Sequence, residues 1–231
     1  GGLIRSYQAA SKEGLEHSTV LSVSDGVLAQ IDADYNSIGK IQGRTDIPLN
    51  EEGVKSAYAL AAEMRTQGYI PTEIFTSPLA RAYKTAEIVA SEFSLTPEAV
   101  TDFQEMSFGL WEGLSWKEIT EKYPAEFKTW NHDRTAQIPE GESYIDLTRR
   151  IIPELRRACE KSEGDFAIVA HGAVIMAMHV IYEGIEFESI DKIMRHIKNS
   201  SVTVFDAERM LENAEKFEKS GRLDIRKGNK L

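Results

Sequence analysis

The chain of 231 residues has a mass of 25.9 kDa, and its 42% hydrophobic content suits one globular domain with a single core. A formal charge of −10 and an isoelectric point near 5.1 disfavour binding to nucleic acid or to an anionic membrane surface. A lone cysteine, Cys159, excludes an intrachain disulfide framework, and no Cys/His spacing resembles a structural zinc site.

Targeting signals are also missing from the sequence. No apolar run approaches the length of a membrane span, and the N-terminal segment lacks the apolar core of a signal peptide. We therefore expect a cytoplasmic protein that uses no cofactor. Because the overall charge is negative, an anionic ligand must be held by a local cluster of positive groups.

Short apolar, β-branched runs alternate with longer helical patterns, which predicts an α/β fold with a mainly parallel sheet and helices on both faces. The predicted strands are Val27 to Ile31, Glu73 to Thr76, Phe166 to Ala170 and Val202 to Phe205. Weaker strand candidates lie at Val20 to Val23 and Asp224 to Arg226.

Four helices are predicted from capping residues and apolar periodicity, and the charge-rich residues 207–222 are a further candidate for a solvated helix. The first begins after Asn50, a good N-cap residue followed by two glutamates, and ends at Gly68. The others span Leu79 to Phe93, Tyr144 to Glu160 and Ala173 to Tyr182. Within the third of these, Pro153 is expected to kink or split the helix.

The helical pattern breaks between Pro97 and Pro139, where short helical pieces carry most of the large aromatic residues. Aromatic residues interleaved with acids indicate an insertion, at about 97–139, that packs over one end of the sheet and serves as a lid. The predicted domain spans residues 27–206, between an N-terminal extension at 1–26 and a C-terminal tail at 207–231.

Four segments, in order along the chain, carry the polar residues that suggest chemistry: NSIGKIQGRTDIPLN at 36–50, SPLARA at 77–82, EMSFGLWEG at 105–113 and FAIVAHG at 166–172. Arg81 falls in the first turn of a helix, where a guanidinium and free backbone N–H groups can converge on one anion. His171 ends a buried strand, and open α/β sheets bind ligands at the carboxyl ends of their strands.

Together these segments resemble the histidine phosphatase superfamily, which is phosphoglycerate-mutase-like, over most of residues 27–206. The resemblance implies a three-layer α/β/α fold with the helical, aromatic insertion over the pocket. It implies that Asn36, Arg44 and Arg81 bind an anion, that Glu105 donates a proton and that His171 hydrogen-bonds the phosphoryl group. Taken singly, Arg81 is explained as well by pairing with a surface carboxylate, and Glu105 as a solvated loop residue; the ordered set favours the site.

The resemblance fails at the phosphate-accepting histidine. Counting back from Asn36, the family's Arg-His-Gly triplet falls on Ala29, Gln30 and Ile31, and no histidine lies between His17 and His132. A glutamine amide nitrogen is conjugated and barely nucleophilic, so Gln30 cannot take the phosphoryl group. Replacing the arginine by alanine also removes a charge-assisted contact worth about 1.5–3 kcal/mol to a bound phosphate.

Three functions remain open. The first is a protein that binds a small anionic metabolite, bearing phosphate or carboxylate, either as a pseudophosphatase or as an enzyme using Glu105 and His171 for acid/base chemistry. The second is an active phosphatase or phosphomutase that uses direct water attack or an unusual nucleophile, such as Asp32 or Asp34. The third is a purely structural interaction protein. Assembly as a homodimer stays open in all three.

Overall fold

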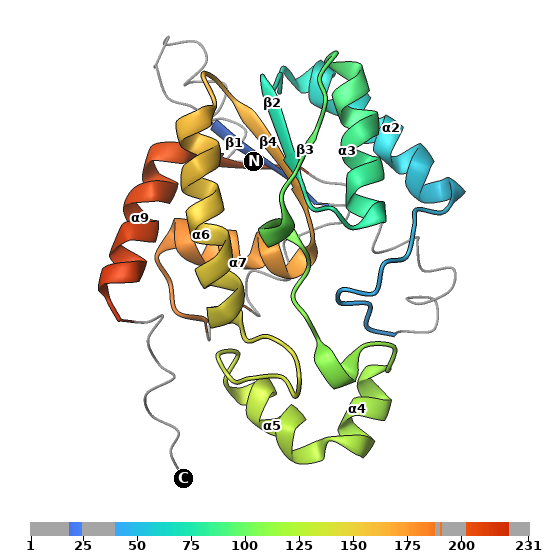
Figure 1. The fold of residues 1–231 in the computed structure, drawn as a ribbon, viewed down its shortest axis with the longest axis vertical. Helices are drawn as coiled ribbons and strands as arrows, with labels where there is room; N and C mark the ends of the chain where they lie inside the picture. The colour runs from blue at the N-terminus through green and yellow to red at the C-terminus, as the bar shows by residue number, and fades with distance from the viewer. Residues whose placement is uncertain (1–18, 25–39, 188–189, 191–201, 222–231) are drawn as a thin grey trace.

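The computed structural model describes residues 19–24, 40–187, 190 and 202–221, and its centre is a five-stranded sheet (Figure 1). The strand order is β3 (Glu98–Ala99), β2 (Glu73–Thr76), β4 (Phe166–Ala170), β1 (Thr19–Ser24) and β5 (Val202–Asp206). All neighbouring pairs are parallel except β1 and β5, which are antiparallel. The predicted mainly parallel sheet is therefore confirmed.

The carboxyl ends of the three central parallel strands meet at one edge of the sheet. Ser24 of β1 pairs with Ala170 of β4, and Thr76 of β2 pairs with Val169 on the other side of β4. Residues that directly follow β2 and β4 therefore lie together, as ligand-binding residues do in open α/β sheets.

Most of the strand predictions are confirmed. The strands β2 and β4 have the predicted bounds, β5 extends one residue beyond its prediction, and the weaker candidate at Val20 to Val23 is part of β1. The predicted strands Val27 to Ile31 and Asp224 to Arg226 lie outside the described residues. The strand β1, which the sequence interpretation left in the N-terminal extension, lies between β4 and β5 inside the sheet.

Alternate residues of the strands face two helical layers, as the period of two in a strand requires. On one face, Ile74, Ala167 and Val169 pack with buried residues of α2 (Glu51–Gln67) and α3 (Ala80–Glu92). On the other, Phe75, Phe166 and Ile168 belong to the cluster that contains α6 (Tyr144–Lys161), α7 (Gly172–Glu183) and α9 (Ala207–Lys219). In Figure 1 α2 and α3 lie to the right of the strands, and α6 and α9 to the left. The fold is thus a three-layer α/β/α sandwich.

Local signals at the helix ends act as the sequence predicts. The Asn50 side chain accepts a hydrogen bond from the Gly53 N–H, and Gly68 ends α2 in the left-handed conformation. The expected split at Pro153 is wrong, since α6 runs unbroken from Tyr144 to Lys161. Pro153 faces solvent, and the buried residues on either side of it, among them Ile152 and Leu155, hold the two halves of the helix against the core.

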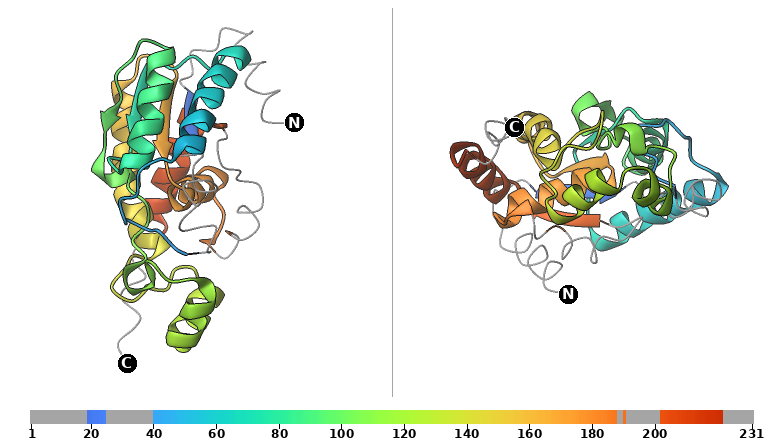
Figure 2. Two further views of the ribbon diagram at one scale, coloured as in Figure 1. Left: turned by 90° about the vertical axis from the view of Figure 1, so that its right-hand side faces the viewer. Right: turned by 90° about the horizontal axis from the view of Figure 1, so that it is seen from below.

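The segment predicted as an insertion combines an edge strand, short helices and an aromatic cluster. After β3 come two 3₁₀ turns, η2 (Thr101–Phe103) and η3 (Gly109–Trp111), and then α4 (Trp116–Lys122) and α5 (Pro124–His132). Figure 1 shows α4 and α5 below the sheet, and the left panel of Figure 2 shows them projecting from the main body. Trp111, Trp116, Phe127 and Trp130 hold this part together, with ring centroids 5.5–6.5 Å apart.

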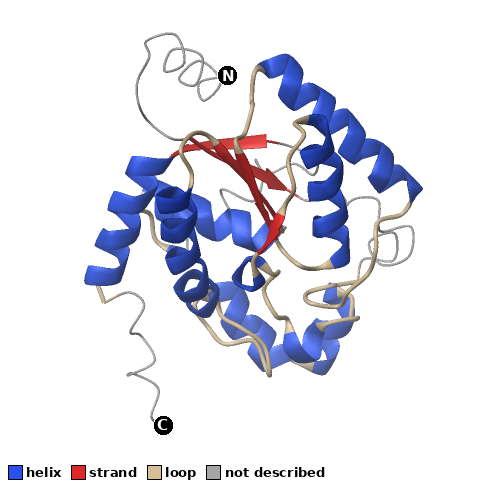
Figure 3. Ribbon diagram, turned by 45° about the horizontal axis from the view of Figure 1, so that its top comes forward, coloured by secondary structure: helices blue, strands red, loops and turns tan. Residues whose placement is uncertain are grey.

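The helix α9 lies in the segment assigned to a C-terminal tail, yet Met210, Ala214 and Phe217 pack into the main core. Figure 3 shows the strands enclosed by helices. No helix within the described part of the chain is long and apolar enough to cross a membrane.

Candidate functional site

His171 lies directly after β4, at the N-cap position of α7, and is fully buried. Its Nε2 atom is 2.7 Å from the hydroxyl oxygen of Ser77, which follows β2 and is also buried. The backbone N–H of Ser77 donates to the carbonyl of Val169 at 3.0 Å, so the β2–α3 connection is fixed against β4. The predicted placement of His171 at the carboxyl edge is therefore observed.

Arg81 lies in the first turn of α3, four residues after Ser77, and its side chain is fully buried. Its Nη2 donates to the carbonyl of Gly43 at 2.9 Å, and its Nη1 donates to the carbonyl of Thr45 at 3.0 Å. Asp46 accepts a hydrogen bond from the Ala80 N–H at 2.7 Å. The loop that contains Arg44 is thus held on the start of α3.

The same loop is held from its other side by Glu112, whose role sequence reasoning missed. The Glu112 carboxylate accepts hydrogen bonds from the Arg44 N–H, the Thr45 hydroxyl and the Phe108 N–H at 3.0–3.1 Å. Gly43 adopts a φ of +55°, and a Cβ there would come 2.2 Å from Glu112 Oε1. The signal that could have identified Glu112 is its place between Trp111 and Gly113 in the third motif.

Glu105 is 6% exposed, and its side chain lies at the start of α7, the helix that His171 precedes. Its Oε1 accepts a hydrogen bond from the Met106 N–H at 2.7 Å, and its Oε2 lies 3.4 Å from the N–H of Ala173. A carboxylate beside a helix N-terminus is favoured by the dipole of the helix and by its unpaired N–H groups. Glu105 and His171 therefore both lie at the N-terminal end of α7.

Arg44 points toward the backbone of Glu105. Its Nε donates to the Glu105 carbonyl at 3.1 Å, and its Nη2 donates to Glu142 Oε1 at 2.8 Å. The structure therefore brings Arg44, Arg81, Glu105 and His171 into one connected group. In this arrangement both arginines donate to protein groups, so their binding to an anion stays a prediction.

One further residue of this group, Arg150, was missed from the sequence. Glu142 lies between the guanidinium groups of Arg44 and Arg150, and its carboxylate also accepts from the Ser107 N–H at 3.0 Å. Burial alone would raise the pKa of Glu142, but hydrogen bonds from Arg150 and Ser107 and the charges of Arg150 and Arg44 hold this pKa below its usual value. Glu142 is therefore ionised near neutral pH.

The remaining predicted positions lie outside the described residues. They are Asn36, and Gln30 as the position of the lost nucleophile. The described strand next to β4 ends at Ser24, five residues before position 29, where the triplet alignment begins. Within the described ranges, no group of three or more His, Cys, Asp or Glu side chains could hold a metal ion.

The fold and the site define a three-layer α/β protein with buried arginine, histidine and glutamate side chains gathered at the carboxyl edge of its sheet. The histidine phosphatase superfamily (branch 1) matches residues 32–218 of this chain. The chain therefore belongs to that superfamily.

Individual relatives agree with this assignment, and a solved structure shares the fold. The chain is 34% identical over 151 residues to the metal-independent phosphoserine phosphatase of Arabidopsis thaliana, covering 63% of each chain. It is 30% identical over 200 residues to phosphoglycerate mutase-like protein 4 of the same plant, covering 84% of this chain and 81% of the relative. The structure of YhfR from Bacillus stearothermophilus is similar in fold, with a TM-score of 0.72 at 24% identity, over 81% of this chain and 90% of that one.

Proposed function

We propose that this protein binds a small anionic ligand, bearing a phosphate or a carboxylate, and has lost the phosphohistidine step of its superfamily. It acts either as a pseudophosphatase or as an enzyme repurposed to acid/base chemistry through Glu105 and His171. The observation that carries the proposal is that His171, Ser77, Arg81 and Glu105 are kept together and buried, although the position that aligns with the family's phosphate-accepting histidine is Gln30.

The loss of the nucleophile is supported by the sequence whichever position is taken as equivalent. Alignment from Asn36 gives Gln30, while counting from the end of β1 gives Asp25, the residue that follows Ser24. Neither is histidine, and every position from 18 to 131 lacks one. His17 precedes β1 in the sequence and lies outside the described residues.

The names of the relatives suggest the ligand class. One is called a phosphoserine phosphatase and another is phosphoglycerate mutase-like, so the ligand of this chain would be a small metabolite with a phosphate group. The buried Arg81 and the N-terminus of α7 are the groups that would attract such an anion in a protein with a net charge of −10.

Thermal unfolding in the presence of inorganic phosphate tests whether the protein binds a small anion at His171. At ten times its Kd, phosphate should stabilise the protein by about 1.4 kcal/mol, which raises the Tm by roughly 3–6 °C. His171→Gln should abolish this rise, while His132→Gln, which changes an exposed histidine on α5, should keep it. No rise in the wild type, or the same rise in both variants, would refute a phosphate site at His171.

Turnover of phosphate monoesters separates a pseudophosphatase from the active alternative. With no histidine nucleophile, we expect no phosphoprotein intermediate and no His171-dependent hydrolysis of phosphoserine or phosphoglycerate. Acid/base chemistry on the same ligands would instead be measured as proton exchange at carbon in deuterated water. If neither ligand binding nor turnover depends on His171, the purely structural function is favoured.

One observation favours keeping an active phosphatase as a second candidate. Ser24 pairs with Ala170, the residue before His171, and the sequence continues from Ser24 to Asp25, which lies outside the described residues. Aspartate is an established phosphoryl acceptor: a carboxylate oxygen attacks phosphorus, the ester bond breaks, and the departing alkoxide takes a proton from an acid such as Glu105.

The aspartate alternative has a direct test. If it operates, hydrolysis of a monoester should be lost in Asp25→Asn and retained in Asp32→Asn and Asp34→Asn, and borohydride should trap the acyl phosphate as a reduced residue at position 25. Equal activity in all three variants would exclude Asp25 as the acceptor.

A further inference from the structure

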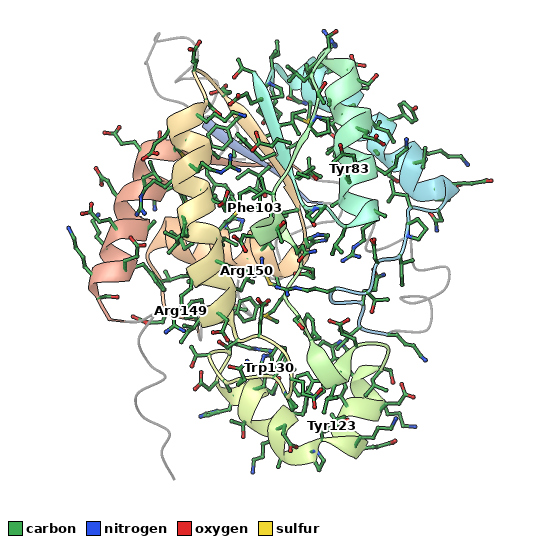
Figure 4. The ribbon with its side chains drawn as sticks, viewed as in Figure 1. Tyr83, Phe103, Tyr123, Trp130, Arg149 and Arg150 are labelled. Atoms are coloured by element: carbon green, nitrogen blue, oxygen red, sulfur yellow. The ribbon has the colours of Figure 1, made fainter. Side chains whose placement is uncertain are left out.

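Arg150, in the second turn of α6, donates to three backbone carbonyls at or just before Glu105. Its Nη2 donates to the carbonyls of Gln104 and Glu105 at 2.8 and 3.0 Å, and its Nη1 donates to the carbonyl of Asp102. Its Nε donates to Glu142 Oε1 at 2.9 Å. In Figure 4 Arg150 lies near the middle of the molecule, while the neighbouring Arg149 lies nearer the left edge.

These contacts matter because residues 104–108 form no helix or strand. Backbone carbonyls in such a segment have no ladder partners, and a buried carbonyl needs a donor from elsewhere. Arg150 supplies donors to the carbonyls on the N-terminal side of this segment, and its side chain is only 13% exposed. A planar guanidinium can contact several carbonyls at once in a fixed geometry, which a lysine cannot do.

Glu142 holds the other end of the segment. Its N–H donates to the Ser107 carbonyl at 2.8 Å, and its carboxylate accepts from the Ser107 N–H. Gly141 permits this approach, since a Cβ there would come 2.5 Å from the Ser107 carbonyl oxygen. Ser143 and Asp146 form a capping box at the start of α6, which fixes Glu142 relative to Arg150.

Glu105 therefore lies between a backbone stretch held by Arg150 and one held by Glu142. A third contact, from Arg44, joins it to the loop at 43–45. Arg44 donates both to the Glu105 carbonyl and to Glu142, while the carbonyls on either side of Arg44 accept from Arg81. The backbone at Glu105 is thus mechanically linked to the arginine that the sequence predicts to bind the anion.

We propose that Arg150, braced by Glu142, is a positioning residue that holds the carboxyl group of Glu105 at the N-terminus of α7. This inference deepens the proposed function and rests on it for its purpose, because the position of Glu105 matters only if the site binds a ligand or moves protons. Arg150 touches no ligand itself and acts through the backbone of residues 102–105.

Amide NMR signals test the positioning without any knowledge of the substrate. The N–H groups of Met106 and Ala173 face the two oxygens of the Glu105 carboxylate, so Glu105→Gln identifies the signals that report on it. In Arg150→Gln both signals should move toward their positions in Glu105→Gln. In Arg156→Gln, which removes a partly exposed arginine from a later turn of the same helix, they should stay at their wild-type positions.

A second variant covers the outcome in which Arg150→Gln does not fold. Glu142→Gln keeps the shape of the side chain that holds Arg150 but removes its charge. It should move the Met106 and Ala173 signals in the same direction by a smaller amount. If either folded variant lowers the Tm yet leaves both signals at their wild-type positions, Arg150 only stabilises the fold and the inference is wrong.

Inorganic phosphate then separates this inference from the proposed function. Phosphate should shift the signals of residues 171–173 in the wild type and should bind at least threefold more weakly to Arg150→Gln. If phosphate shifts no signal in the wild type, the proposed anion site is contradicted. The N–H signals of Met106 and Ala173 then still decide whether Arg150 positions Glu105. If phosphate binds and Arg150→Gln binds it equally, with unmoved reporters, only the positioning role fails.

Discussion

The imidazole Nε2 of His171 and the hydroxyl oxygen of Ser77 are 2.7 Å apart, although 94 residues separate them in sequence. Both side chains are fully buried, and both directly follow parallel strands that are neighbours in the sheet. This pair joins the histidine to the connection that carries Arg81. The contact therefore links the two halves of the candidate site through the architecture of the sheet.

Removing the hydroxyl in Ser77→Ala should destabilise the protein by about 1–3 kcal/mol, because a buried imidazole nitrogen loses its partner. For a chain of this size that corresponds to a fall in Tm of roughly 2–12 °C. Calorimetry measures the change, and Ser91→Ala, at an exposed position late in α3, should alter the Tm little. Equal effects of the two substitutions would show that the His171 contact contributes nothing to stability.

Glu142 should make the protein sensitive to acid. Its pKa in the folded protein lies below the ordinary value of 4.5, so the unfolded chain binds the proton more readily than the folded one. The stabilisation is complete above about pH 4.5 and is lost as the pH falls through the lowered pKa of the folded state. Urea unfolding between pH 6 and pH 3.5 should therefore show a smaller loss of stability in Glu142→Gln than in the wild type.

A matched control for this acid effect is Glu98→Gln. The pKa of Glu98 is also lowered, chiefly by its hydrogen bond to Lys161, but its side chain is 37% exposed and solvent screens the interaction. Its replacement should therefore change the loss of unfolding free energy between pH 6 and pH 3.5 much less than Glu142→Gln does. The reverse order would mean that the buried network at Glu142 is not what makes the protein acid-sensitive.

Features that depend on local sequence were predictable. Glu73–Thr76 and Phe166–Ala170 are short β-branched or apolar runs, and Asn50 and Gly68 bound α2 because their side-chain and backbone chemistry caps a helix wherever it occurs. The positions of Arg81, Glu105 and His171 followed from strand ends and from ordered motifs.

Features that depend on distant partners were not predictable. Glu112 and Arg150 look like ordinary solvated charges in the sequence, and their roles come from contacts across 45 to 68 residues. The place of β1 between β4 and β5 was equally hidden, because no periodic pattern reports which strands are neighbours in a sheet. Both the long-range side-chain contacts and the place of β1 depend on the tertiary arrangement, which local propensity does not encode.

Cys159 should be an unreactive thiol in the native protein. It lies on α6 against the main core, and burial, with a smaller contribution from the charge of Glu160, raises its pKa to about 12. At pH 8 the thiolate fraction is then about 10⁻⁴, compared with roughly a quarter for an unfolded cysteine. Alkylation by iodoacetamide, followed by intact mass, should be at least about 100-fold slower in buffer than in urea. Rapid single labelling of the native protein would contradict this.

Gly43 should be the least replaceable residue of the loop that carries Arg44. Its φ of +55° disfavours any side chain, and a Cβ would also displace the Glu112 carboxylate, which lies 2.2 Å from the position of that atom. Gly113 has a φ of +77°, but no atom lies within 4 Å of the place that a Cβ would take. Its replacement therefore measures the free-energy cost of the backbone conformation alone. We expect Gly113→Ala to cost about 1–2 kcal/mol and Gly43→Ala about 2–4 kcal/mol in urea unfolding.

The same pair of variants tests whether the loop supports the anion site. The Gly43 carbonyl accepts a hydrogen bond from Arg81, so displacing this loop should also disturb the guanidinium. Gly43→Ala should therefore weaken the stabilisation by inorganic phosphate, whereas Gly113→Ala should leave it unchanged. If both variants respond to phosphate as the wild type does, the loop contributes to stability alone, and Arg81 is held for binding by other contacts.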